Sequence, residues 1–348
     1  MPQENLTYPL QAPQPGHWRE VAQGVYWVRL PMPLALDHIN VWLIEDGDGF
    51  ALVDTGMRTE QTVDIWNALL GAPPFNKRLT RVFVTHMHPD HVGMAGWLTR
   101  RFKVRLWMSR LEYLTCRVML SDMSREAPPD ALEYFREAGW PDVAMEKYRA
   151  RFGAFGKMIY ALPDSFHRLS HGQELRIGSS RWQVVIGRGH SPEHACLYNA
   201  QQKLLISGDQ VLPRISSNVS VHPLEPAANP MRDWMESLDW IEQNIPDDVL
   251  VMPAHDDCFL GLHARVRHLR ESQTRSFERL RDALAGEPRR VTDVFTALFS
   301  RPIDAHSSHY HLATGEAQAC MNYLLERGEI TRTLQDGVAW YQRAPAVA

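Results

Sequence analysis

A short polar segment directly after an apolar run places the strongest constraint on how this chain folds. Residues 81–86, RVFVTH, have the character of a buried strand, and the loop HMHPDH and a helical pattern over 92–101 follow. This order places the loop at the carboxyl end of a strand, where loop side chains converge on a site held by rigid elements. The loop therefore offers His86, His88, Asp90 and His91 as candidate metal ligands.

Three more candidate ligands stand at the ends of later strand-like runs. His190 lies in GRGHSPEH, Asp209 in SGDQ and His255 in PAHD. Together with the loop they give each of two ions at least three nitrogen or oxygen donors, with one carboxylate shared, as a two-metal hydrolytic site requires. Imidazole and carboxylate suit zinc, iron or manganese, and we take two zinc ions as the default.

These residues resemble the ligand pattern of the metallo-beta-lactamase superfamily. Its HxHxDH motif, a later histidine, an aspartate and a last histidine occur in order, and its VDTG motif is intact at 53–56. The resemblance covers roughly residues 22–258 and implies an α+β fold, a four-layer αβ/βα sandwich of two mixed sheets with helices outside. It also implies that His86, His88 and His190 hold the first metal, that Asp90, His91 and His255 hold the second, that Asp209 bridges them, and that Asp54 orients a ligand.

The sequence pattern predicts three segments. Residues 1–20 are rich in Pro and Gln and are expected to form an N-terminal arm, and residues 21–260 form the catalytic domain with a helical cap insertion at about 109–160. Residues 261–348 give three helical patterns and a short hairpin, the order of a winged-helix module. The methionines and aromatic residues of the insertion fit a packing layer as well as a pocket lining.

Composition and charge narrow the partners. A net charge of −4 draws the whole molecule neither to nucleic acid nor to anionic membrane, and residues 259–348 hold 12 Arg against 10 acidic residues, a weak basis for phosphate binding. The four cysteines are scattered without a CxxC pair, the first residues have neither the basic nor the apolar pattern of a leader, and no apolar run is long enough to span a bilayer. We therefore expect a cytoplasmic protein with no membrane partner, and nucleic acid is disfavoured.

The pattern indicates a hydrolase that acts on a thioester, ester or lactone through a metal-bridging hydroxide. Asp90 is the candidate catalytic residue, because it could orient the nucleophile and carry a proton to the leaving group. The segment GHSPEH resembles the GHTPGH-like segment of glyoxalase II relatives, with Glu193 in place of a glycine, and His194 is a candidate for a supporting or pocket-lining role. The expected substrate is a small molecule with an apolar or acyl portion.

Other functions remain open at this point. A lactamase-like endoribonuclease or phosphodiesterase would use the same metals with a winged helix, and a mononuclear-iron dioxygenase would hold one iron in the same frame. A non-catalytic regulator would bind DNA through the winged helix and sense a ligand with the metal domain. A homodimer is compatible with the surfaces of the extra helices and of the C-terminal segment.

Overall fold

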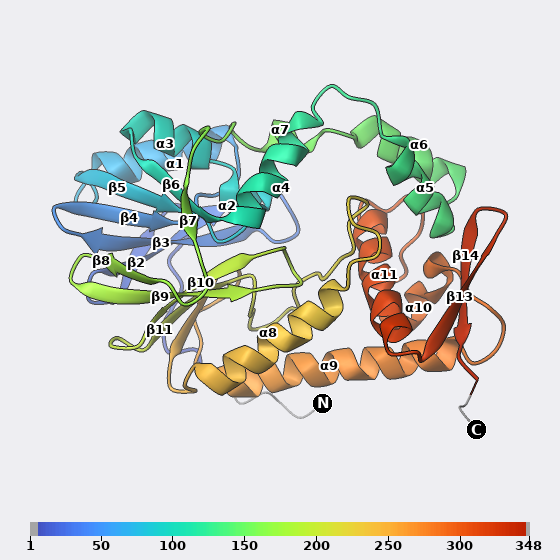
Figure 1. Ribbon diagram of the computed structural model, residues 1–348. Helices are drawn as coiled ribbons and strands as arrows, with labels where there is room; N and C mark the ends of the chain where they lie inside the picture. The colour runs from blue at the N-terminus through green and yellow to red at the C-terminus, as the bar shows by residue number, and fades with distance from the viewer. Residues whose placement is uncertain (1–5, 346–348) are drawn as a thin grey trace. The chain divides into compact units, whose positions relative to one another are not determined.

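The computed structural model describes residues 6–345 (Figure 1). Contacts divide these residues into two compact units. The first comprises the chain up to Met123, Gly153–Ser217 and Trp240–Val266, and the second comprises Ser124–Phe152, Asn218–Asp239 and the chain from Arg267. Every candidate metal ligand lies in the first unit.

Two sheets form the framework of the first unit. The seven-stranded sheet has the order β1-β2-β3-β4-β5-β6-β7, antiparallel from β1 to β4 and parallel from β4 to β7. Its strands are β1 Trp18–Ala22, β2 Val25–Pro31, β3 His38–Asp46, β4 Gly49–Val53, β5 Arg78–Phe83, β6 Arg105–Ser109 and β7 His167–Leu169. The five-stranded sheet, β12-β11-β10-β9-β8, is antiparallel except for its β11–β12 pair. Its strands are β8 Glu174–Ile177, β9 Ser180–Gly187, β10 His194–Asn199, β11 Leu204–Gly208 and β12 Leu250–Pro253.

Side chains on both faces of β2 are buried, which makes the seven-stranded sheet an inner layer. Tyr26, Val28 and Leu30 belong to one core, whereas Val25 and Trp27 belong to another. This alternation is the two-residue period of a strand. Side chains from α1 and α3 complete the first core, and side chains from β9 and β11 complete the second. The sheet therefore packs against helices on one face and against the five-stranded sheet on the other.

Helices of the first unit lie in the connections between the parallel strands β4 to β7. They are α1 Glu60–Gly71, α2 Pro89–Val92, α3 Ala95–Phe102, α4 Arg110–Ser121 and α7 Phe155–Met158. α2 follows β5, and α4 begins directly after β6, so both start at the carboxyl edge of the sheet. α8 Pro230–Asn244 and α9 Leu262–Ala283 contribute residues 240–244 and 262–266 to this unit.

The second unit is built from helices and a hairpin. Besides parts of α8 and α9 it contains α5 Pro129–Glu137, α6 Asp142–Arg151, the 3-10 turn η1 Val291–Val294, α10 Phe295–Leu298, α11 Tyr310–Glu326, β13 Ile330–Gln335 and β14 Val338–Arg343. Phe135 stacks on Trp140 with ring centroids 4.0 Å apart, and Trp140 Nε1 donates to Thr314 Oγ1 at 2.8 Å. These contacts tie the α5–α6 segment to α11.

The contacts divide the chain differently from the sequence-based segments. Residues 124–152, expected inside a cap insertion of the catalytic domain, group with the second unit, while α4 and α7 stay in the first. Tyr134 and Phe135 are buried in the second unit and Phe155 in the first, so these aromatic side chains serve as packing. Of the arm at 1–20, residues 1–5 lie outside the described range, Thr7 pairs with Leu260, and β1 begins at Trp18.

Candidate metal centre

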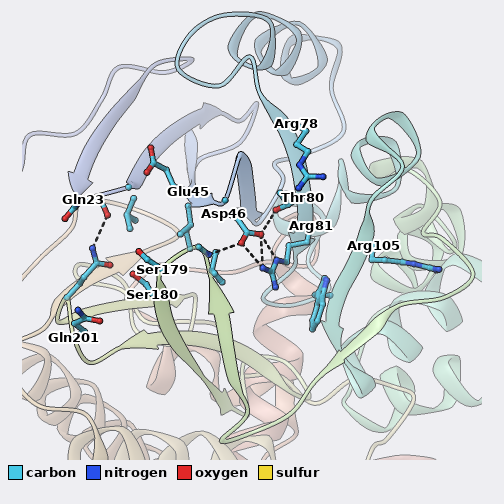
Figure 2. Close-up of a pocket in the computed structure, with 18 of the residues that line it drawn as sticks. Gln23, Glu45, Asp46, Arg78, Thr80, Arg81, Arg105, Ser179, Ser180 and Gln201 are labelled. Atoms are coloured by element: carbon cyan, nitrogen blue, oxygen red, sulfur yellow. Dashed lines mark hydrogen bonds and ion pairs between the residues drawn. The ribbon is translucent and has the colours of Figure 1, made fainter.

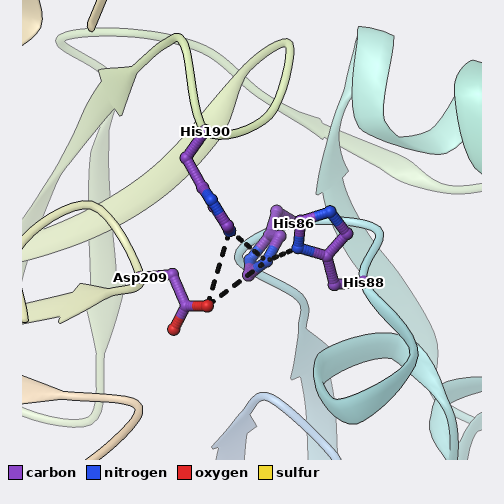
Figure 3. Close-up of side chains that lie close together, drawn as sticks. All are labelled: His86, His88, His190 and Asp209. Carbon is purple, nitrogen blue, oxygen red and sulfur yellow. Dashed lines mark hydrogen bonds and ion pairs between the residues drawn. The ribbon is translucent and has the colours of Figure 1, made fainter. Parts of the chain in front are cut away.

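Seven side chains at strand ends of both sheets come together in two groups. The nearest ligand atoms of His86, His88, His190 and Asp209 all lie within 4.8 Å of one another (Figure 3), and the same holds for Asp90, His91 and His255. His86 and His88 follow β5, and Asp90 and His91 lie in α2. The other three follow strands of the second sheet: His190 follows β9, Asp209 follows β11 and His255 follows β12. All seven residues predicted as ligands are thus brought to one place.

The first group is a cluster of facing imidazole nitrogens. His86 Nε2 lies 2.9 Å from His88 Nδ1 and 3.2 Å from His190 Nε2. Burial, reinforced by the neighbouring histidine His190, lowers the pKa of His88 to about 3, and burial likewise holds the pKa of His86 well below its ordinary value. These two rings are therefore neutral near pH 7, the state in which imidazole binds a metal.

The second group is surrounded by carboxylates. His255 Nε2 lies 3.3 Å from Asp90 Oδ2 and 3.5 Å from Asp209 Oδ1. Burial alone would lower the pKa of His255, but these two carboxylates outweigh it and raise the pKa to about 10. In His91, burial is outweighed in the same way by Asp54, Asp209 and Asp90, so its pKa is raised well above the ordinary value. Without a metal, His255 therefore holds a proton at neutral pH, and the carboxylates favour the protonated form of His91 as well.

Asp209 faces both groups. Its Oδ2 lies 3.4 Å from His190 Nε2, and its Oδ1 lies 3.5 Å from His91 Nε2. Each carboxylate oxygen is thus directed at a different group, which is the position that the family resemblance implies for a bridging ligand. Burial would raise the pKa of Asp209, but the nearby His255 and His91 hold it well below the usual range, so the carboxylate is charged.

Two atoms show that these residues fit a cation. Among the described residues, buried His91 Nε2 and buried Asp209 Oδ1 have no hydrogen-bond partner, although they face each other. Leaving buried polar atoms unsatisfied costs free energy, and a coordinated ion removes that cost. Imidazole and carboxylate donors are those that divalent transition metals accept. The geometry therefore supports a potential divalent metal site.

Residues around the ligands hold them in place. Asp54 accepts the Thr85 N–H and, with its Oδ2, the Nδ1–H of His91 at 2.8 Å, so it fixes that ring as the VDTG motif predicts. His194 is fully buried, and its Nε2 accepts the Asp209 N–H at 3.0 Å, which assigns it the supporting role. The His38 carbonyl accepts the Nδ1–H of His255 at 2.9 Å. Outer contacts of this kind orient metal ligands.

Two buried supports were missed from the sequence. The Asn40 amide donates to the Pro253 and Asp256 carbonyls and so holds the turn that carries His255. The Glu112 carboxylate, on α4, accepts the backbone N–H groups of Met87 and Glu193. Burial raises the pKa of Glu112 above its ordinary value. A charged residue on the buried face of a helix was the one signal that could have found Glu112.

A cavity of about 970 Å³ lies elsewhere in the first unit (Figure 2). Its lining includes Arg78 and Arg105, which begin β5 and β6, whereas the metal residues follow the other end of β5. Inside it, Asp46 accepts hydrogen bonds from Thr80, Arg81 and the Gly178 N–H. Its charge is compensated and no candidate ligand lines this cavity, so we assign it no part in the chemistry.

Comparisons with known proteins agree with the fold. The profile of the Metallo-beta-lactamase superfamily matches residues 34–255, and that of a metallo-beta-lactamase-like C-terminal domain matches residues 277–344. A solved beta-lactamase domain protein from Burkholderia ambifaria is 37% identical with a TM-score of 0.88, over 97% of this chain and 98% of its own. The chain belongs to the metallo-beta-lactamase superfamily. The α+β fold predicted from the resemblance is confirmed, while the winged helix stays a prediction.

Two curated relatives are more distant. A probable metallo-hydrolase of Bacillus subtilis is 24% identical over 59% of this chain and 76% of its own length. An acyl-coenzyme A thioesterase of Gallus gallus is 24% identical over 56% of this chain and 65% of its own length. The family and the clustered ligands together define a superfamily hydrolase with a potential metal site. Within residues 6–345, every helix falls short of the length and apolar character needed to cross a membrane.

Proposed function

We propose that this chain is a binuclear metallo-hydrolase, with zinc as its default metal, that cleaves thioesters or related esters and lactones with an apolar acyl portion. The observation that carries the proposal is the placement of Asp209 between two groups of ligands, one oxygen toward each. In this proposal His86, His88 and His190 hold one ion, Asp90, His91 and His255 hold the other, and Asp209 is shared.

The chemistry of the site is divided between the ions and the chain. When bound, two divalent ions would supply Lewis acidity, lowering the pKa of water and polarising a carbonyl oxygen. His91 Nδ1 is held by Asp54 and His255 Nδ1 by the His38 carbonyl, so the Nε2 atom of each ring is turned toward Asp209 Oδ1. These contacts keep both ligand rings oriented throughout turnover, which lowers the cost of reaching the transition state.

Asp90 is the candidate proton carrier. Burial would raise its pKa, but His91 and His255 lower it to about 2, so without a metal the carboxylate is charged at neutral pH. As water adds to the substrate carbonyl, Asp90 would take up the proton that the water releases. It would then deliver that proton to the sulfur or oxygen of the leaving group as the bond to the acyl carbon breaks.

An exposed apolar stripe on α4 supports an acyl substrate. Leu111, Leu114 and Val118 are 45%, 48% and 45% exposed, and their spacing places them on one face of the helix. α4 is joined to the site, because the Leu111 N–H donates to the Glu193 side chain at 2.9 Å, three residues after His190. The thioesterase relative supports a substrate of this class, and an exposed apolar patch can mark a ligand-binding groove.

The test combines metal content with substrate turnover. Protein purified without chelator should contain about two metal ions per chain, and it should hydrolyse acyl thioesters faster than bis-nitrophenyl phosphate. His88→Ala should lose both metal and turnover, and His17→Ala, at an exposed histidine outside the site, should keep both. One iron per chain with oxygen consumption would replace the hydrolase by a dioxygenase, and faster cleavage of the phosphodiester would replace it by a phosphodiesterase.

A further inference from the structure

Glu112 connects two loops that come from different sheets. One loop, 86–88, follows β5 of the seven-stranded sheet, and the other, 189–193, joins β9 to β10 of the five-stranded sheet. Glu112 Oε2 accepts the Met87 N–H at 2.9 Å, and Glu112 Oε1 accepts the Glu193 N–H at 2.7 Å. The carboxylate thus gives one oxygen to each loop, directly beside the candidate ligands of the first metal.

The side chain of Glu193 in turn binds α4, the helix that carries Glu112. Its Oε2 accepts the Leu111 N–H at 2.9 Å in the first turn of α4. Amides of a first helical turn have no acceptor within the helix, so this side chain satisfies one of them and anchors the start of α4. The glutamate that replaces the glycine of the related motif therefore has a structural task in this chain.

The chemistry of the contact requires a carboxylate. Glu112 is 0% exposed, and burying a charged group is costly unless it is hydrogen-bonded. Two backbone N–H donors need two acceptor atoms, and a carboxylate has two, whereas an amide of the same size has one acceptor and one donor group. If the side chain only filled space, an uncharged Gln, Met or Leu would do so at a lower free-energy cost of burial.

We propose that Glu112 and Glu193 form a positioning pair that sets the separation of His86 and His88 from His190, and with it the affinity of the first metal site. The inference rests on the proposed metal centre, but not on the identity of the substrate. The backbone bond from the Ala195 N–H to the Thr85 carbonyl also joins the two strand ends at 2.8 Å. Beyond that bond, the pair fixes the loops themselves and the start of α4.

The experiment measures metal binding rather than activity. Cobalt(II) is titrated into chelator-treated protein against a chromophoric competitor, and the visible spectrum reports the ligand geometry of each equivalent. Glu112→Gln should weaken the first equivalent about 10–100-fold, as loss of outer supports does in metal sites, and alter its spectrum. Glu112→Asp, which keeps both acceptors on a shorter side chain, should show a smaller loss of affinity.

Glu316→Gln is the matched control. Glu316 is a glutamate of the second unit whose Oε2 accepts the Asn218 amide at 2.7 Å, and its pKa is raised to about 7 by burial. The control replaces a buried carboxyl without touching the metal loops, so cobalt binding should not change. A wild-type Kd and spectrum in Glu112→Gln would overturn the proposal. If Glu112→Gln does not fold, the Kd of Glu112→Asp decides in its place: a weaker first equivalent supports the pair, and an unchanged one overturns it.

Glu193→Gly separates the two members of the pair. It keeps the backbone N–H that Glu112 binds but removes the acceptor of the Leu111 N–H. Binding of the first cobalt equivalent should then weaken, but less than in Glu112→Gln, because Glu112 still binds both loops while the start of α4 has lost its anchor. A wild-type affinity for the first equivalent would remove Glu193 from the pair. Tight cobalt binding without any thioesterase activity would overturn the proposed function and leave the positioning pair intact.

Discussion

The two groups of candidate ligands lie side by side but differ in what surrounds their imidazoles. In the first group His86 and His88 face other histidines, and burial lowers their pKa values. In the second, His91 and His255 face the carboxylates of Asp90 and Asp209, and their pKa values are raised. The first group therefore offers free nitrogen lone pairs at neutral pH, whereas the second offers protonated rings.

This difference predicts that the first group binds its metal ion before the second group does. A cation entering the first group displaces no proton from His86 or His88, while a cation entering the second must displace protons from His91 and His255. The residues that support the two groups also differ. Glu112 accepts backbone N–H groups of the loops beside the first group, whereas Asp54 binds a ligand ring of the second group directly. Three experiments can break or sharpen the comparison.

Removing the carboxylate of Asp209, which both groups share, should weaken metal binding at both groups instead of at one. Asp209→Asn leaves a side chain of the same shape, but it removes the negative charge that faces both groups. Metal content should fall at both sites, and kcat/KM should drop by more than the about 100-fold that loss of an outer support costs. Elemental analysis and thioester kinetics measure both effects. Retention of one ion with the spectrum of an intact first group would mean that Asp209 is not shared.

Lowering the pH should weaken the second ion far more than the first. The pKa of His255 is raised to about 10 and that of His91 is raised as well, so an entering cation has to displace protons from these rings. Each proton displaced lowers the apparent affinity about tenfold for each unit by which the pH falls. Between pH 8 and pH 6 the second cobalt equivalent should therefore lose up to about 100-fold per unit, whereas the first should change little. If the affinities for the first and the second cobalt equivalent fell equally with pH, the comparison between the two groups would be wrong.

Loss of Asp54, which supports the second group, should weaken the second metal equivalent, whereas loss of Glu112 should weaken the first. Asp54→Asn can still accept the Thr85 N–H, but it turns a donor toward His91 Nδ1 or loses that contact. The second equivalent should weaken about 10–100-fold while the first is unchanged. Asp48→Asn, at an exposed aspartate paired with Arg78, is the matched control. Equal weakening of both equivalents would show that Asp54 stabilises the whole centre rather than one ligand.

The sequence predicted the ligands because they lie in short local patterns. His86, His88, Asp90 and His91 fall within six residues, and His190, Asp209 and His255 each follow an apolar run that is recognisable as a strand. A strand end is a position that a local pattern encodes, and the parallel neighbours β11 and β12 bring Asp209 and His255 to the same edge of their sheet. The α+β class followed from the family resemblance that these motifs carry.

The supports and the division into units depend on contacts between distant residues. Glu112 and Glu193 are 81 residues apart, and the Asn40 side chain binds the Asp256 carbonyl across 216 residues. Their partners are backbone groups, which every residue type offers, so the type of the partner residue does not reveal the contact. Residues 124–152 join the second unit for the same reason, because Trp140 bonds Thr314 across 174 residues. Helical periodicity could place helices in this segment but could not indicate which core they join.

The smallest expected effect tests whether α4 extends the site toward an acyl group. Leu114→Ser removes apolar surface from a side chain that is 48% exposed and thus available to a substrate. Losing contact with half of a leucine costs about 1 kcal/mol, so KM for long acyl thioesters should rise about fivefold. KM for acetyl thioesters should change little, because a two-carbon acyl group has little apolar surface to bury against the leucine.

Leu334→Ser, at a leucine of β13 that is 55% exposed in the second unit, is the matched control and should leave both KM values unchanged. A rise in KM that is equal for short and long acyl groups would place Leu114 in general support of the site rather than in acyl recognition. The chain-length dependence therefore decides whether the exposed stripe belongs to the active site. It also separates the role of α4 in binding substrate from its role in carrying Glu112.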